Sequence, residues 1–221
     1  MKTLALLCLL VVSLHARADL LITQTVDTNG QQDTKTIKIK GDMVRADSPA
    51  RSSIIDTASG DIITLNNTEK TYTEMTGDQI KAGTAKLQAM MHAGGAPQRS
   101  GAQPVDTGTS EKLNGYETEI YTAQTPVSQF TYWVSTDYPN AAALQEQFSK
   151  LQTSMQSKLG FAGMFAPDTS KLPGVILKTE MDFSGRTITT TLVSVKDAPI
   201  DDADFKIPAG FTEKQIPAGL P

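Results

Sequence analysis

The sequence predicts a mainly β fold of the α+β class, with one curved antiparallel sheet of about ten or eleven strands and two helices. Short segments rich in Thr, Ile and Val alternate apolar and polar side chains, as strands with one buried face do. Only a few turn residues separate these segments, so neighbours in the chain are expected to pair. Two amphipathic stretches interrupt the strands, and they are the elements available to cover the apolar face of the sheet.

A meander of five strands is expected between residues 36 and 75. Its first strand carries Ile37 and Ile39 on one face and polar residues on the other. Gly60 lies in a hairpin loop and can take the positive φ that such loops need. The five expected strands cover residues 36–40, 43–47, 53–56, 62–65 and 70–75, and another strand over residues 19–26 precedes them.

Two helices and four further strands are expected after the meander. Thr76 and Gln79 have the spacing of a capping box, which predicts a helix start there. A second helix is expected over residues 140–159, where apolar side chains recur at three- and four-residue steps. Its apolar residues are Leu144, Phe148, Leu151, Met155 and Leu159. The remaining strands are expected at residues 118–122, 130–135, 175–183 and 187–195, whereas residues 204–211 contain too many breakers for regular structure.

The N-terminus has the features of a secretory signal peptide. Lys2 precedes a short apolar run, and small residues end at Ala18, where we expect cleavage. Cys8 lies inside the apolar run rather than just after it, which disfavours lipoprotein processing. We therefore expect a signal peptide over residues 1–18, a single domain over residues 19–221, and a periplasmic or secreted protein whose membrane contact is at most peripheral.

Charge and cysteine content exclude several classes of function. Cleavage removes the only cysteine, so disulfides, zinc–thiolate sites and a cysteine nucleophile are not expected. Without Lys2 and Arg17, 18 of the 20 basic residues remain against 24 acidic ones, a net charge of about −6. Nucleic-acid binding depends on a basic patch, and none is visible. Residues 93–106 are rich in Gly and Pro and are expected to form a flexible loop.

Several segments together resemble an uncharacterised family of secreted bacterial proteins. They are residues 40–47, 54–56, 70–75, 113–117, 132–134 and 205–211, and their motifs are mainly turn and strand signatures. That family is similar to the LolA-like lipoprotein-carrier superfamily, whose fold is an incomplete antiparallel barrel with a helical lid over an apolar cavity. The resemblance implies a half-barrel whose concave face is covered by the two helices and which holds an acyl chain or other apolar group.

Catalytic and metal-binding chemistry finds little support in the sequence. His92 is the only histidine after the signal peptide, and its position near a helix end suits a solvated cation better than a base. Asp201, Asp202 and Asp204 lack the ligand spacing of a calcium loop and are expected to be solvated surface acids. We therefore expect no cofactor, no metal site and no enzymatic activity.

A group of flexible and aromatic apolar residues is the candidate binding site. Thioethers and aromatic rings line promiscuous apolar sites, although the same residues could simply pack the helices onto the sheet. The candidates are Met90, Met91, Trp133, Phe148, Leu151, Met155, Phe161, Met164 and Phe165. The expected partner is an apolar small molecule, lipid or acyl group. The alternative is an envelope scaffold with a filled core, which binds an envelope protein through a strand edge or the Gly-rich loop.

Overall fold

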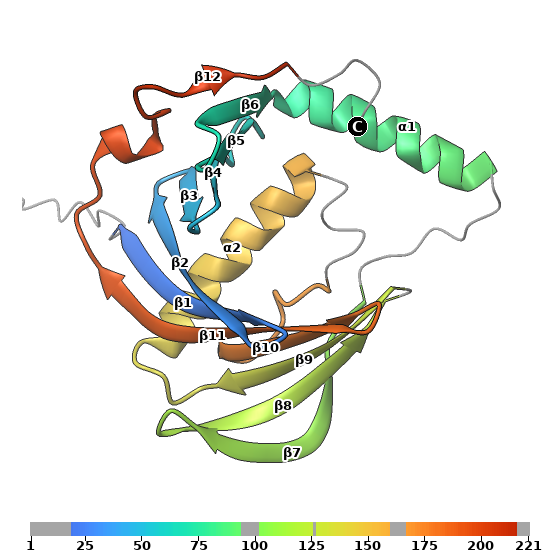
Figure 1. The fold of residues 1–221 in the computed structure, drawn as a ribbon. Helices are drawn as coiled ribbons and strands as arrows, with labels where there is room; N and C mark the ends of the chain where they lie inside the picture. Colours follow the sequence, from blue (N-terminus) through green and yellow to red (C-terminus); the bar gives the residue numbers. More distant parts are fainter. Residues whose placement is uncertain (1–18, 94–101, 126, 160–166, 216–221) are drawn as a thin grey trace, which may run out of the picture.

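The computed structural model describes residues 19–93, 102–125, 127–159 and 167–215, which form one curved, open sheet of twelve strands with two α-helices (Figure 1). The first six strands are β1 (Leu20–Thr28), β2 (Gln31–Lys40), β3 (Met43–Asp47), β4 (Arg51–Asp56), β5 (Ile62–Asn66) and β6 (Thr71–Met75). After helix α1 (Gly77–Ala93) come β7 (Val105–Leu113), β8 (Tyr116–Gln124) and β9 (Ser128–Ser135). Helix α2 (Ala141–Leu159), β10 (Val175–Phe183), β11 (Arg186–Asp197), the 3₁₀-helix η1 (Asp202–Phe205) and β12 (Thr212–Glu213) complete the chain.

The sheet consists of two meanders joined in the middle. Its strand order is β12-β6-β5-β4-β3-β2-β1-β11-β10-β9-β8-β7, and β1 pairs with β11 along its whole length. Every pairing is antiparallel except that between β12 and β6. The expected mainly β class and the meander of five strands are therefore confirmed, with β2 to β6 in the predicted places. The two outer strands, β7 and β12, do not pair with each other, so the barrel stays open.

Turn chemistry sets the register of the central hairpin. Asn29 and Gly30 connect β1 to β2 with φ values of 54° and 88°. Two successive positive φ angles define the type of two-residue turn whose twist matches that of paired strands. The register that follows places Ile22 opposite Ile37. This pairing aligns the apolar residues of both strands on the face toward α2.

The start of helix α1 is fixed by the predicted capping box and by one close approach. The Gln79 amide donates to Thr76 Oγ1 (3.3 Å), and the Thr76 amide donates to Gln79 Oε1 (2.8 Å). The Gly77 amide donates to Asp61 Oδ1 (2.8 Å), a bond that lowers the pKa of Asp61. A Cβ on Gly77 would collide with the Ser59 carbonyl, so this contact with the β4–β5 loop requires glycine.

Helix α2 crosses the concave side of the sheet, and α1 contacts α2 (Figure 1). Ala141 and Leu144 of α2 are buried in the main core with residues of β1, β2, β3, β10 and β11. The sheet residues of this cluster are Leu20, Ile22, Ile39, Val44, Val175, Leu177 and Leu192. Among the helices of the described residues, none is long and apolar enough to cross a membrane.

A second core lies under the C-terminal segment, where regular structure was not expected. Ile200 and Phe205 are buried against Ile54 of β4 and Leu65 of β5. The prediction of an irregular segment over residues 204–211 is wrong at its start, where η1 extends to Phe205, whereas residues 206–211 form no helix or strand. Strand β12, which the sequence did not predict, follows them and extends the sheet beside β6. Asp201 is the N-cap of η1, because its side chain accepts a hydrogen bond from the Ala203 amide (2.9 Å).

Strand β7 is the other element that the sequence did not predict. It is exposed at every position before Leu113, and its sequence VDTGTSEKL has no apolar alternation. It pairs with β8, with an irregularity between Asp106 and Ser110, and its last residue, Leu113, packs against the main core. Because β7 begins at Val105, the last two residues of the expected loop 93–106 belong to a strand; residues 94–101 of that loop lie outside the described part of the chain.

Ion pairs fasten the C-terminal segment to β2 and β3. Lys38 pairs with Asp204 (2.6 Å) and Lys40 with Asp202 (2.7 Å), while Arg45 donates to the Asp204 carbonyl (2.6 Å). Asp202 is a surface acid as expected, with its side chain 81% exposed, but the sequence did not predict the ion pairs that Asp202 and Asp204 form. Their hydrogen bonds to Lys38 and Lys40 lower the pKa of both carboxyl groups.

These ion pairs predict a loss of stability in acid. Because the pKa of Asp204 is lower in the folded chain, its stabilising contribution is complete above the ordinary Asp value of about 3.9 and disappears as the pH falls through the folded value. Urea unfolding of Asp204→Asn should show a lower free energy of unfolding than wild type at about pH 6, and a smaller difference at about pH 3. Asp33→Asn, at an exposed position of β2, is the control. An Asp204→Asn deficit of equal size at both pH values would contradict the assignment.

Candidate functional site

An apolar pocket of about 390 Å³ lies between helix α2 and the concave face of the sheet. Strands β1, β2, β10 and β11 form its floor, and one side of α2 forms its roof. The floor residues are Ile22, Gln24, Ile37, Ile39, Ile176, Leu177, Thr179, Thr190 and Leu192, and the other lining residues are Gln145, Phe148, Ser149, Leu151, Gln152, Met155 and Thr169. Among these described residues none is ionisable, so the site suits an uncharged apolar group.

Strand alternation and a bulge in β10 place the floor residues. Ile22 and Gln24 lie two positions apart on β1, as do Thr190 and Leu192 on β11, so each pair faces the same side. The pairing of β10 with β9 is irregular between Ile176 and Lys178. A bulge of this kind brings two successive residues to one face, and Ile176 and Leu177 accordingly both line the pocket.

The roof residues follow the helical period. Phe148, Leu151 and Met155 recur at steps of three and four and lie on one face of α2, as the sequence predicts. Phe148 and Leu151 also pack against the main core, so the helix touches the sheet and leaves space beside the contact. These three residues are the members of the predicted apolar group that the structure brings together around one pocket.

Other predicted residues lie elsewhere. The Met90 side chain on α1 is 64% exposed and does not line the pocket. Phe161, Met164 and Phe165 fall outside the described residues, as do the side chains of Met91 and His92. The prediction that Met90, Met91, Phe161, Met164 and Phe165 bind a ligand therefore stays a prediction.

Trp133 is buried but faces away from the pocket. Its neighbour Tyr132 pairs with Thr179, which lines the pocket, and successive strand residues point to opposite faces. Lys178 pairs with Trp133 across the strands and holds its ammonium 3.9 Å from the centre of the indole ring. On the pocket side, burial strongly raises the pKa of Tyr132, so this phenol stays neutral in any ordinary buffer.

The wall of the pocket beside α2 is held by hydrogen bonds that sequence reasoning did not anticipate. Gln152 donates to the Pro167 carbonyl (3.2 Å) and accepts from the Thr169 hydroxyl (2.7 Å). Gln145 donates to the Thr169 carbonyl (3.3 Å). Glutamines on the polar side of an amphipathic helix carry no signal of such a role in the sequence. These bonds fix the segment at residues 167–169 against α2 and close that side of the pocket.

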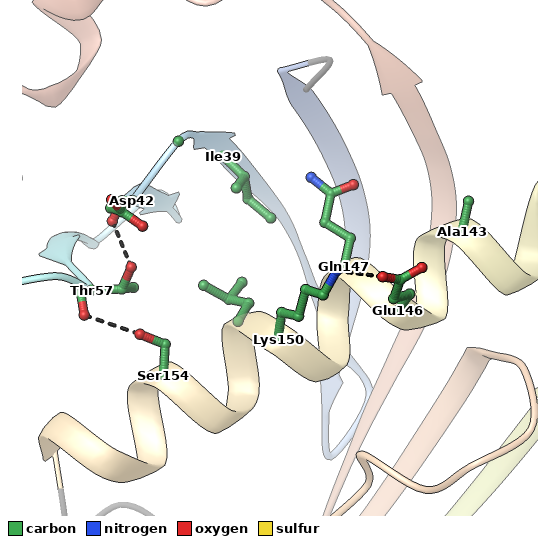
Figure 2. Close-up of a pocket in the computed structure, with 10 residues that line it drawn as sticks. Ile39, Asp42, Thr57, Ala143, Glu146, Gln147, Lys150 and Ser154 are labelled. Carbon is green, nitrogen blue, oxygen red and sulfur yellow. Dashed lines mark hydrogen bonds and ion pairs between the residues drawn. The ribbon is translucent and has the colours of Figure 1, made fainter. Parts of the chain in front are cut away.

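A second pocket of about 270 Å³, lined by polar, charged and apolar residues, lies between α2 and the loops that follow β2 and β4 (Figure 2). It is lined by Ile39, Gly41, Asp42, Thr57, Ala143, Glu146, Gln147, Lys150, Leu151 and Ser154. Ser154 on α2 donates to the Thr57 carbonyl (3.0 Å), and the Thr57 hydroxyl donates to the Asp42 carbonyl (2.9 Å). Lys150 forms an ion pair with Glu146 one helical turn earlier. Ile39 and Leu151 line both pockets.

Fold and site together define an open, curved antiparallel sheet that holds a helix in its concavity and keeps an uncharged apolar pocket beneath it. Residues 20–211 match the family described as "Domain of unknown function (DUF4412)", and the chain belongs to that family. No curated protein matches the chain.

The solved structures to which the chain is similar differ widely from it in sequence. The chain is similar to PNGF-II at 12% identity and a TM-score of 0.43, covering 91% of this chain and 31% of PNGF-II, so it spans about a third of that protein. A DUF1329 family protein from Desulfovibrio piger ATCC 29098 matches at 9% identity and a TM-score of 0.35, over 87% of this chain and 90% of the other. The MucA/MucB complex of Pseudomonas aeruginosa contains a match at 10% identity and a TM-score of 0.36, over 86% of this chain and 56% of the other.

Leu151 anchors the roof of the pocket, which leads to a stability prediction. Leu151→Ala should lower the free energy of unfolding by about 2 kcal/mol, the lower end of the range for buried leucines, because Leu151 is only partly buried. Thr153→Ala, at an exposed position of the same helix, should change it by less than about 0.5 kcal/mol. Urea unfolding followed by circular dichroism measures both. Equal losses for the two variants would show that α2 is not held through Leu151.

Proposed function

We propose that this protein is a LolA-like, non-enzymatic binding protein that holds a lipid, an acyl chain or another apolar ligand under α2. The observation that carries the proposal is the uncharged pocket between the helix and the concave face of the sheet. Its volume of about 390 Å³ falls within the range of about 300–1,000 Å³ that is usual for small-molecule sites. Leu, Ile, Phe and Met side chains line it, with a few uncharged polar groups among them.

The flexibility of the lining favours a chain-like or variable ligand. Phe148 and Met155 reach the pocket from the helix, and a thioether adapts to different ligand shapes at little cost. Burying a methylene group in such a site contributes about 0.8 kcal/mol, so affinity should rise with chain length until the pocket is full. An apolar ligand is therefore the natural occupant of this space.

The alternative role, an adaptor with a filled core, fits the geometry less well. A filled core requires side chains to occupy the space beneath α2, where the pocket lies. An adaptor could instead use the exposed edge strand β7 for pairing. The irregularity of β7 between Asp106 and Ser110 interrupts its ladder, however, and such bulges commonly protect sheet edges from pairing with other chains. Both features favour the carrier.

A location outside the cytoplasm is part of the proposal. The leader at residues 1–18 has the charged start, apolar run and small residues of a secretory signal peptide. A carrier in the periplasm or outside the cell would shield an apolar group during transit through water. Such a role needs no catalytic residue, in keeping with a pocket lined by uncharged side chains.

Filling the pocket should abolish binding. Thr190 lines the pocket on β11, and its neighbour Thr189 faces the opposite side of the same strand, so Thr190→Phe and Thr189→Phe form a matched pair. Thr190→Phe should weaken binding of the neutral apolar dye N-phenyl-1-naphthylamine at least about tenfold, whereas Thr189→Phe should leave it nearly unchanged. Fluorescence titration of the purified protein measures both affinities, and circular dichroism checks that both variants fold.

Lipid extraction and native mass spectrometry of the protein purified from its host provide a second test. Wild type and Thr189→Phe should carry bound apolar molecules that Thr190→Phe lacks. A wild-type protein that is reproducibly empty and also fails to bind the dye would overturn the carrier function. Equal dye binding by the two variants would place the ligand somewhere other than beneath α2.

A further inference from the structure

A lysine lies at the rim of the apolar pocket. Lys35 precedes Ile37 of the pocket floor by two residues on β2, so both side chains point to the same face of the sheet, about 7 Å apart along the strand. The register places Lys35 opposite Gln24 of β1, which also lines the pocket. Residues directly opposite each other have Cβ atoms about 5 Å apart. The Lys35 side chain therefore begins beside the pocket floor.

The charge of Lys35 has no counter-ion among the described residues. Lys35 is half-buried, and its ammonium forms no hydrogen bond or ion pair with another described residue. Asp33 lies two residues earlier on the same face, but it is exposed and does not pair with Lys35. A partly desolvated ammonium is stabilised when an anion comes within reach. The rim of the pocket can thus offer a positive charge to a bound group.

The other basic residues of the four floor strands are directed elsewhere. Lys38 and Lys40 are paired with acids of η1, and Lys178 lies over an indole ring. Lys196 is exposed on the face of β11 that points away from the pocket, and Arg186 is exposed at the turn between β10 and β11. Among the described residues of these strands, Lys35 is therefore the cation placed to meet a charged group at the end of a bound tail.

We propose that the ligand is a fatty acid whose tail lies in the apolar pocket and whose carboxylate lies at the rim, beside Lys35 and Gln24. This inference rests on the proposed carrier function and adds the chemistry of the head group. The Lys35 ammonium supplies the counter-charge. The Gln24 side chain makes no hydrogen bond with another described residue, so its amide is free to donate to the second carboxylate oxygen.

The division of the site into an uncharged pocket and a charged rim matches the two parts of a fatty acid. The described residues that line the pocket include no ionisable group, so the hydrocarbon tail meets uncharged surroundings along its length. Only the end of the chain reaches Lys35. One cation and one amide donor suffice for the two oxygens of a carboxylate, which accept hydrogen bonds and donate none.

Three ten-carbon compounds test the head group while holding the tail constant: decanoate, decanol and decylammonium. Displacement of N-phenyl-1-naphthylamine at neutral pH, below the critical micelle concentration of each, should give the tightest binding for decanoate and the weakest for decylammonium. Decanoate should exceed decanol by about fivefold, the effect of one partly exposed charge pair. Acidic residues outnumber basic ones over the chain, 24 against 20, so the overall charge favours decylammonium and a preference for decanoate identifies a local cation.

Matched variants locate the effect. Lys35→Gln should remove most of the preference for decanoate and leave the affinity for decanol nearly unchanged. Lys35→Arg keeps the positive charge and should keep most of the preference. Lys196→Gln changes the net charge of the protein as Lys35→Gln does, but lies on the far face of the sheet, so it should keep the preference in full. Circular dichroism checks that all three variants fold.

The contrary outcomes separate the head group from the carrier function. Equal affinity for decanoate and decanol, or tighter binding of decylammonium, overturns the fatty-acid inference and leaves the carrier function standing. A preference that Lys196→Gln removes as fully as Lys35→Gln also overturns it, because the overall charge then decides. Dye binding that none of the three compounds displaces overturns the fatty-acid inference alone. A protein that binds neither the dye nor any of the three overturns both.

Discussion

The packing of helix α2 onto the concave face of an open sheet is the constraint on which the fold depends. In a closed barrel the strands themselves enclose the apolar interior. Here β7 and β12 remain apart, so another part of the chain must cover the apolar residues of β1, β2, β10 and β11. Leu144, Phe148 and Leu151 supply it. A straight helix cannot follow a curved sheet along its whole length. Contact therefore concentrates along one line of side chains, and space is left on both sides of that line.

The opposite end of the strand order is stabilised by a different device. Beyond β3 the sheet receives Ile200 and Phe205 from the C-terminal segment as a second apolar cover, and β12 pairs with the edge of β6. Lysines on β2 and acids on η1 hold this segment in register. Residues close to the two ends of the chain thus meet, since the Asp19 carboxylate also accepts from the Ile200 amide (3.2 Å). The meander β1–β6 is covered by α2 and by this segment, and neither cover depends on a disulfide.

The sequence was most informative where one local period decides the structure. Alternation located most of the strands, and the three- and four-residue spacing located α2 with Phe148, Leu151 and Met155 on its inner face. Prediction from the sequence failed where a strand forms only because a neighbouring strand pairs with it. Strand β7 has no apolar face and forms because its backbone pairs with β8. Strand β12 consists of two residues whose backbone pairs with β6. Trp133 was predicted to bind a ligand because it is aromatic. The alternation of β9 instead places it beside Lys178, on the face of the sheet that points away from the pocket.

Side-chain size explains why a space persists beneath α2. Cross-strand partners Thr179 and Thr190 bring two short side chains together on the floor, and Gln24 adds a polar one nearby. Branched apolar residues at these positions would fill the concavity, as Ile39 and Leu192 do closer to the helix contact. Hydroxyl groups of threonine also need hydrogen-bond partners, which an empty apolar core does not offer and an open pocket does. The floor of the pocket thus combines apolar residues that belong to the core with short and polar residues that do not complete it, and this combination leaves a space beneath α2.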